Sequence, residues 1–157
     1  MGFSLFKSFF QEEKEGNEEP TGKEGEKERE TVTIIELTLI SINNITRSTD
    51  ALGKIDPYVK IYGNGQLLGR TKTVDNATSA AINELFRFMP KGSPREMTYK
   101  FVLWDTDDIG ADDQVGSGVF NSGTEECLEE QTVYLKCKGE EIGSVSINVV
   151  FKDIYLV

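Results

Sequence analysis

The chain of 157 residues contains no histidine, only two cysteines, and no apolar run long enough to cross a bilayer as a helix. Without histidine, Ser-His-Asp and Cys-His catalysis, the usual zinc ligands and the ordinary general base near neutral pH are excluded. Two cysteines are too few for a disulfide framework, and free thiols in a cytoplasmic protein are the favoured interpretation. The sequence therefore disfavours the common hydrolase chemistries, and we do not expect an enzyme.

Negative charge dominates what is present. There are 27 Asp and Glu residues against 17 Lys and Arg, which gives a formal net charge of −10. Because phosphate binding needs a cationic surface, this balance argues against a nucleic-acid partner and leaves a cation-binding protein open. The charge is also uneven, since nine Glu against four Lys and Arg in residues 11–30 place a net −5 in that short stretch.

The first 30 residues differ in composition from the rest. Residues 11–30 contain no aliphatic or aromatic side chain, so nothing there offsets the entropy of ordering. Ahead of them, Phe3, Phe6 and Phe10 recur at helical spacing and would form an apolar stripe for a bilayer or a protein partner, or simply a frayed terminus. We therefore divide the chain into residues 1–30, a Phe-rich start plus a disordered acidic linker, and residues 31–157, a folded domain.

The folded domain shows short β-rich runs separated by Gly, Asn and Asp clusters, and no long segment with a helical period. The eight runs are 31–42, 58–62, 69–74, 84–89, 97–104, 116–120, 132–137 and 144–151. Eight short strands in a domain of this length predict an all-β fold, an eight-stranded antiparallel Greek-key β-sandwich with functional loops at one end.

Aspartates are concentrated in two of these loops. Asp50 and Asp56 come just before the run 58–62, whereas Asp105, Asp107 and Asp113 follow the run 97–104. If the two loops meet, the carboxylates repel one another by about 4 kcal/mol per close pair at an effective dielectric near 20, unless a cation lies between them. The pattern therefore favours a cation site made by these five side chains.

The donor type selects the ion. Oxygen ligands without histidine or thiolate favour a hard divalent ion, and calcium accepts a crowded set of carboxylates more readily than magnesium. The EF-hand spacing is absent. The alternative is that these aspartates only form turns and are solvated, and for Asp108 and Asp112 that interpretation is preferred.

Three stretches carry a family resemblance: DALGKIDPYVK at 50–60, NELFRF at 83–88 and WDTDDIGADDQVG at 104–116. Residues 31–157 resemble, through them, the C2 domain of protein kinase C and synaptotagmin. The resemblance implies two calcium ions held by Asp50, Asp56, Asp105, Asp107 and Asp113, with the backbone carbonyls of Thr49 and Thr106 as further ligands. The order of the runs resembles the circularly permuted, type II topology.

The resemblance implies calcium-dependent peripheral binding to an anionic membrane, with phosphatidylserine as the expected lipid. Bound calcium would reverse the charge of the acidic loops and attract the anionic leaflet of the cytoplasmic side. Leu52, Lys54 and Ile109 are expected to contact lipid at the loop tips. The alternative is a calcium-independent adaptor that binds a protein or a phosphoinositide.

A second surface follows from strand alternation. Tyr58 and Lys60 project to one face of their strand, and Arg70 and Lys72 are expected to do the same on a neighbouring strand. In members that resemble protein kinase C, these positions together with Trp104 bind phosphatidylinositol bisphosphate, so the resemblance implies a basic groove here. The alternative is a solvated sheet face.

Overall fold

A computed structural model describes residues 29–46, 54–91, 96–122 and 127–156. These residues form eight strands and no helix, and every recorded strand pair is antiparallel. The strands are β1 (Thr31–Asn43), β2 (Pro57–Gly63), β3 (Gln66–Arg70), β4 (Ala80–Phe88), β5 (Thr98–Asp105), β6 (Asp113–Asn121), β7 (Cys127–Cys137) and β8 (Glu140–Tyr155). The all-β, eight-stranded antiparallel prediction is confirmed.

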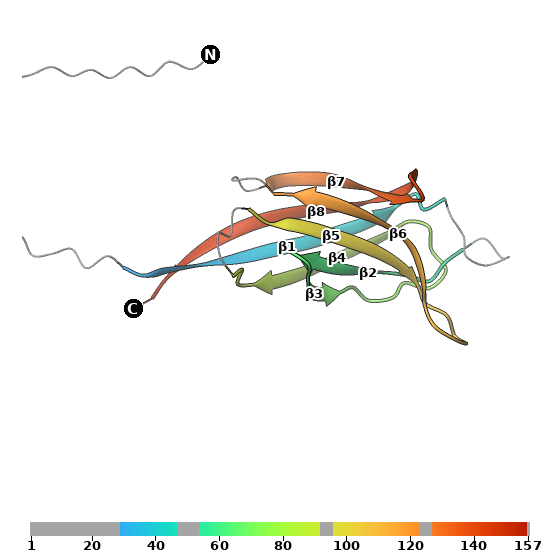
Figure 1. Cartoon of the computed structure of the whole chain (residues 1–157), viewed down its shortest axis with the longest axis horizontal. Coiled ribbons are helices and arrows are strands. Elements are labelled where there is room, and N and C mark those ends of the chain that lie inside the picture. The colour runs from blue at the N-terminus through green and yellow to red at the C-terminus, as the bar shows by residue number, and fades with distance from the viewer. Residues whose placement is uncertain (1–28, 47–53, 92–95, 123–126, 157) are drawn as a thin grey trace, which may run out of the picture.

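The strands follow one another in the order β3-β2-β5-β6-β7-β8-β1-β4 and run roughly parallel to the long axis of the domain (Figure 1). They divide into two layers, one of β3, β2, β5 and β6 and one of β7, β8, β1 and β4. A single residue pair, Ser117 opposite Lys136, joins β6 to β7. We call this contact the seam.

Two glycines allow the close approach at the seam. A Cβ atom on Gly118 would overlap the backbone carbonyl of Tyr134, and one on Gly116 would lie 2.9 Å from the carbonyl oxygen of Lys136. Since real Cβ atoms do not come so close to backbone, any other residue would push the strands apart.

Strand alternation places the core between the layers. In β1, Ile35, Leu37 and Leu39 are fully buried, and they face the same interior as the aromatic rings of Tyr99 and Phe101 on β5. The intervening residues of β1 and β5 are directed to the outside of the sandwich. Each layer therefore has an outer face that does not form part of the core.

The strand predicted at 69–74 overlaps the observed strand only at its end. The sequence suggested a strand at 69–74, but β3 ends at Arg70. The cause is Thr71, whose amide donates to the carbonyl of Val59 and whose hydroxyl accepts the amide of Val59, both at 2.9 Å. The next amide, that of Lys72, donates to the carboxylate of Glu84 at 3.0 Å, so the strand pairing stops.

Candidate functional site

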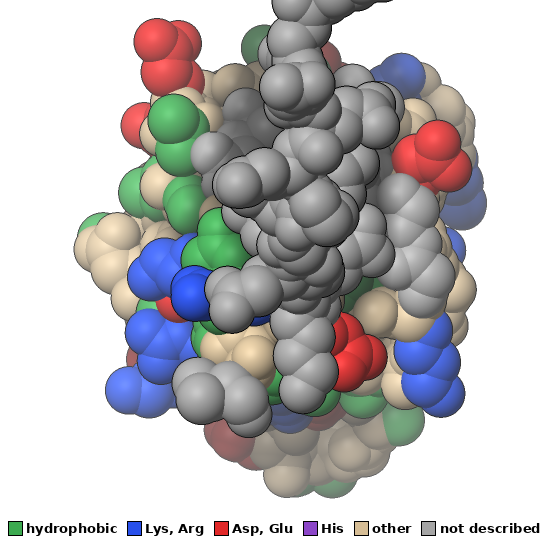
Figure 2. Space-filling view, turned by 90° about the vertical axis from the view of Figure 1, so that its left-hand side faces the viewer, with side chains coloured by type: hydrophobic (Ala, Val, Ile, Leu, Met, Phe, Trp, Pro, Cys, Tyr) green, Lys and Arg blue, Asp and Glu red, His purple; other side chains and the backbone are tan. Residues whose placement is uncertain are grey.

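The acidic residues of the two predicted loops lie at one end of the sandwich. Asp56 precedes the first residue of β2, Asp105 is the last residue of β5, and Asp113 is the first of β6. Asp105 stands opposite Asp113 in the strand pairing, and Pro57 stands opposite Asp105. The structure thus brings these two acidic segments together, as the spacing predicted. The opposite end carries both basic and acidic side chains on its flanks (Figure 2).

Two of the carboxylates hold backbone amides. Asp105 is only 3 % exposed, and its Oδ1 atom accepts the amide of Asp56 at 2.8 Å. The Oδ1 atom of Asp56 accepts the amide of Asn76 at 2.6 Å, while its carbonyl accepts the amide of Thr106 at 3.0 Å. These bonds fix the ends of β2 and β5 to each other.

Asp112, which the sequence suggested was a solvated turn residue, has a structural role. Its Oδ2 atom accepts the hydroxyl of Tyr58 at 2.7 Å, and its Oδ1 atom accepts the amide of Asp107 at 3.2 Å. The hydrogen bond from Tyr58, followed by that from the backbone of Asp107, holds the pKa of Asp112 below its usual range. Sequence spacing could not reveal this contact, because Tyr58 lies 54 residues away.

The described residues do not by themselves form a metal centre. Within them, no three Asp, Glu or Cys side chains are gathered closely enough to hold an ion. Two predicted ligands, Asp50 and Thr49, lie outside the described residues, as does Leu52. The remaining predicted ligands offer only oxygen atoms, which is the donor chemistry that suits calcium.

The other predicted lipid contacts are exposed. Ile109 lies in the loop between β5 and β6 with 94 % of its surface exposed, and Lys54 is exposed just before β2. Single exposed apolar residues are common on protein surfaces, so the exposure makes Ile109 accessible without marking a contact by itself.

The predicted basic groove lies on the outer face of the β3-β2-β5-β6 layer. Lys60 stands opposite Arg70, and Tyr58 stands opposite Trp104 with the two rings stacked, 6.4 Å between centroids and 9° between planes. The Arg70 guanidinium lies 3.6 Å above the Tyr58 ring, and the Lys60 ammonium lies 4.6 Å from the Trp104 ring centroid. We call Tyr58, Lys60, Arg70 and Trp104 the cation–aromatic cluster.

Lys72 differs from the other predicted members of the groove. It follows the end of β3, and its amide is held by Glu84 of β4. The expectation that Arg70 and Lys72 alternate on one strand is therefore wrong, and whether the Lys72 side chain joins the groove stays a prediction.

Burial controls the protonation of the central tyrosine. Tyr58 is 2 % exposed, and desolvation together with the hydrogen bond to Asp112 raises the pKa of its hydroxyl to about 12. Tyr58 therefore remains a neutral hydrogen-bond donor at physiological pH, and it connects the cluster to the acidic loop through Asp112.

A family model for the C2 domain matches residues 33–138, about two thirds of the chain. No curated protein sequence matches this chain. Among solved structures, a C2 domain of plant extended synaptotagmin 1 is 19 % identical, with a TM-score of 0.68, over 80 % of this chain and 98 % of that domain. The human GIVD cytosolic phospholipase A2 is 22 % identical, with a TM-score of 0.59, over 78 % of this chain but only 17 % of the enzyme. At these identities the structural likeness shows the fold.

Proposed function

The chain belongs to the C2 domain family, and on that premise we propose that it is a calcium-dependent module for peripheral binding to anionic phospholipid membranes. C2 domains are in general binding modules for membranes and lipids and are not catalytic, which supports a binding role and argues against an enzyme. We also propose that the chain is recruited to the membrane surface from the cytoplasm. In the part of the chain that the structure describes, no helix is long and apolar enough to span a bilayer.

The observation that carries the proposal is the meeting of the acidic segments at one end of the sandwich. The Asp56 amide donates to the Asp105 carboxylate, and Asp105 stands opposite Asp113. We propose that two calcium ions are held here by Asp50, Asp56, Asp105, Asp107 and Asp113, with the carbonyls of Thr49 and Thr106. Bound calcium would supply positive charge and coordination positions for phosphate and carboxylate oxygens of lipids.

The protein's own side chains would then set how the domain meets the bilayer. The acidic end repels an anionic leaflet as long as its charges are uncompensated. Exposed Ile109, with Leu52, is proposed to enter the interface, and Lys54 to meet headgroups such as that of phosphatidylserine. The cation–aromatic cluster is proposed to bind phosphatidylinositol bisphosphate, with Lys72 as a further cation. Residues 1–10 are proposed as a contact for a bilayer or a protein partner.

One observation favours a second candidate, a calcium-independent adaptor. Asp56 and Asp105 already hold backbone amides, and the described carboxylates do not gather around a common point. On this alternative the acidic end is structural, and the cation–aromatic cluster alone binds a phosphoinositide or an acidic protein segment.

Co-sedimentation of the full chain with phosphatidylserine vesicles separates the two candidates. We expect the protein to pellet in calcium and to remain in solution in chelator. Equal pelleting under both conditions would reject calcium dependence and favour the adaptor.

A paired variant tests the ligand assignment. Asp105→Asn combined with Asp107→Asn keeps oxygen acceptors for the backbone and removes two charges, so we expect it to abolish the rise in melting temperature that calcium produces. Asp75→Asn combined with Asp108→Asn, which removes two exposed acidic charges outside the ligand set, is the matched control and should retain the rise. An unchanged calcium shift in the first variant would contradict the assignment.

A further inference from the structure

A groove opens at the end of the sandwich that lies opposite the acidic end. Among the described residues, no pairing joins β3 to β4, the first and last strands of the order, and the groove lies between the turn after β2 and the residues that follow β4. Its volume is about 410 Å³. We call it the end groove, and its apolar lining consists of Leu67, Leu68, Phe88, Met89, Pro90 and Met97.

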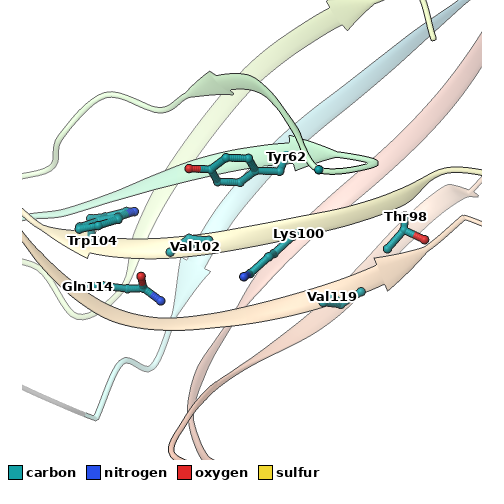
Figure 3. Close-up of a pocket in the computed structure, with 8 residues that line it drawn as sticks. Tyr62, Thr98, Lys100, Val102, Trp104, Gln114 and Val119 are labelled. Carbon is teal, nitrogen blue, oxygen red and sulfur yellow. The ribbon is translucent and has the colours of Figure 1, made fainter. Parts of the chain in front are cut away.

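The turn after β2 forms a rigid wall of the end groove. Asn64 and Gly65 have φ angles of 48° and 80°, and a type I′ hairpin turn requires positive φ at both positions. The Asn64 side chain accepts the amide of Thr98 at 2.9 Å, and the Asn64 amide donates to the carbonyl of Thr98 at 2.9 Å. The turn is thereby fixed to the start of β5, where Figure 3 shows Thr98. This wall therefore stays in place whether or not the groove is occupied.

The end groove leads from an apolar rim into the core. Met97 is 4 % exposed and belongs to the core, and Phe88 packs against the core. Leu67 of β3 is 54 % exposed, and Met89, which follows β4 in the other layer, is 67 % exposed. These two side chains line the same hollow as Met97. They are therefore part of a continuous apolar surface that reaches the core, and such surfaces mark contact sites more often than isolated exposed residues do.

The end of β4 shows where the N-terminal part of the chain joins the domain. Pro90 has no amide hydrogen to donate, and the recorded pairing of β4 with β1 ends at Phe88, opposite Ile35. Residues 31–34 of β1 extend past this point, and β1 begins at the same end of the domain at which β4 ends (Figure 1). Residues 1–28 are therefore connected to the domain at the end that carries the end groove.

The length of chain before β1 matches the distance to the end groove. Arg29 is six positions before Ile35, which is about 20 Å at a strand rise of about 3.4 Å per residue. The composition of residues 11–28 predicts a coil, and a coil of this length has a root-mean-square end-to-end distance of about 21–25 Å. A tether that matches the span gives the highest effective concentration, about millimolar.

The chemistry of residues 1–10 suits this groove. They contain four phenylalanines, at positions 3, 6, 9 and 10, and aromatic rings make favourable contacts with methionine sulfur atoms such as those of Met89 and Met97. Lys91 is the one charged residue of the lining and is exposed. The net charge of −5 in residues 11–30 is opposite in sign, so the chain that follows a docked segment is attracted to Lys91.

We propose that residues 1–10 dock in the end groove of their own chain, with phenylalanine rings packed against Leu67, Met89 and Met97. Docking requires neither calcium nor a bilayer, because the end groove lies at the opposite end from the acidic segments. The inference therefore goes beyond the proposed membrane function and does not depend on it. While docked, residues 1–10 are withheld from the bilayer or protein contact proposed above.

Two methionine methyl groups report on the end groove in the full-length chain. The chain has three methionines, and Met89 and Met97 line the groove. In protein labelled with methyl-¹³C methionine, an aromatic ring packed beside exposed Met89 changes the position of its methyl signal in NMR spectra. We expect the combined variant Phe3→Ser, Phe6→Ser, Phe10→Ser to shift this signal to the position of a solvent-exposed methionine. Gln11→Ser, Asn17→Ser and Thr21→Ser combined, three uncharged replacements in the linker, form the matched control and should leave the signal unchanged.

A groove variant shows where the segment docks. Leu67→Glu places a charge in the apolar rim and should release residues 1–10, so the three Phe→Ser changes should cause no further shift of Met89 in that background. In the background of Leu128→Glu, an equally drastic change at an exposed position of β7 outside the groove, they should shift Met89 as in the parent. Equal shifts in the two backgrounds would overturn the proposal.

The remaining outcomes concern other occupants of the end groove. All spectra are recorded in chelator and without lipid, so a failure of calcium or membrane binding leaves this test unaffected. The same Met89 position in the parent and in the Phe→Ser variant would overturn the proposal. So would a Phe-dependent shift that grows with protein concentration, since it would show that residues 1–10 of one molecule occupy the groove of another.

Discussion

The outer faces of the two layers hold cations in different ways. On the β7-β8-β1-β4 layer, Arg87 and Lys152 both contact one oxygen of Glu36 at 3.0 Å. On the β3-β2-β5-β6 layer, Arg70 and Lys60 lie on aromatic rings, and no ion pair is recorded for either among the described residues. A carboxylate compensates the cations of the first face, whereas the second face holds its cations in place without neutralising them.

A cation on a ring is positioned but remains able to bind an anion. The attraction to a ring is worth about 0.5–1 kcal/mol at an exposed site, which orders the side chain without neutralising its charge. Arg70 also donates to the carbonyl of Thr71 at 3.4 Å and to the hydroxyl of Thr73 at 3.1 Å, and both of these acceptors are uncharged. The acid nearest the cluster, Asp112, directs its oxygens to the Tyr58 hydroxyl and the Asp107 amide. This difference identifies the β3-β2-β5-β6 face as the one prepared for an anionic partner.

The strongest test of the comparison removes both cations from each face in turn. Lys60→Gln with Arg70→Gln should weaken binding to vesicles containing phosphatidylinositol bisphosphate by about 30-fold, because each cation near an anionic surface contributes about 1 kcal/mol. Arg87→Gln with Lys152→Gln makes the same change in net charge and should alter binding by less than about 2-fold. Equal losses in the two variants, measured by co-sedimentation, would show that only net charge matters.

Removing the acid beside the cluster should have the opposite sign. Asp112→Asn keeps an oxygen for the Tyr58 hydroxyl and removes one negative charge, so we expect vesicle binding in chelator to become about 5-fold tighter. Asp75→Asn, an exposed acid in the connection between β3 and β4, should change the affinity by less than about 2-fold. Unchanged binding in Asp112→Asn would mean that its charge does not oppose anions at the cluster.

The smallest expected effect concerns the outer face of the β7-β8-β1-β4 layer. Hydrogen bonds from Lys152 and Arg87 hold the pKa of Glu36 below its usual range. The resulting stabilisation is complete above the ordinary glutamate pKa of about 4.3 and is lost as pH falls through the lower folded-state pKa. Glu36→Gln should therefore lower the melting temperature by about 1–3 °C at pH 7.

In strong acid, Glu36→Gln should have the same melting temperature as the parent. Scanning calorimetry at about pH 3 is expected to show the difference shrinking toward zero. Glu140→Gln, at an exposed position at the start of β8, should show no difference at either pH. If the melting temperature of Glu36→Gln stays below that of the parent in acid, the variant has lost packing and not charge interactions.

Much of the fold was predictable from alternation and turn residues, because each of the eight runs of the sequence overlaps one of the eight strands. The exception at β3 has a local cause, since the hydroxyl of Thr71 takes the place of a backbone acceptor. A pattern of apolar and polar residues does not reveal where a side-chain hydroxyl replaces a backbone acceptor. The long extension of β8 to Tyr155 was also missed, because its last residues are exposed and carry no core alternation.

The candidate site was predictable where it depends on strand ends and not where it depends on side-chain partners. The positions of Asp56, Asp105 and Asp113 at one end follow from their places beside strands. The bond from Tyr58 to Asp112 depends on strand order and register. Those are properties of the folded chain that spacing along the sequence does not determine.

The seam between β6 and β7 has a mechanical consequence. Because Ser117 and Lys136 are the only described residues that pair across it, the two layers are held together mainly by the side chains between them. Gly118 and Gly116 have no side chains that could add packing contacts at the seam. We therefore expect the amide protons along the seam to exchange with solvent sooner than those of the long β1–β8 pairing. The sandwich should open first at the seam.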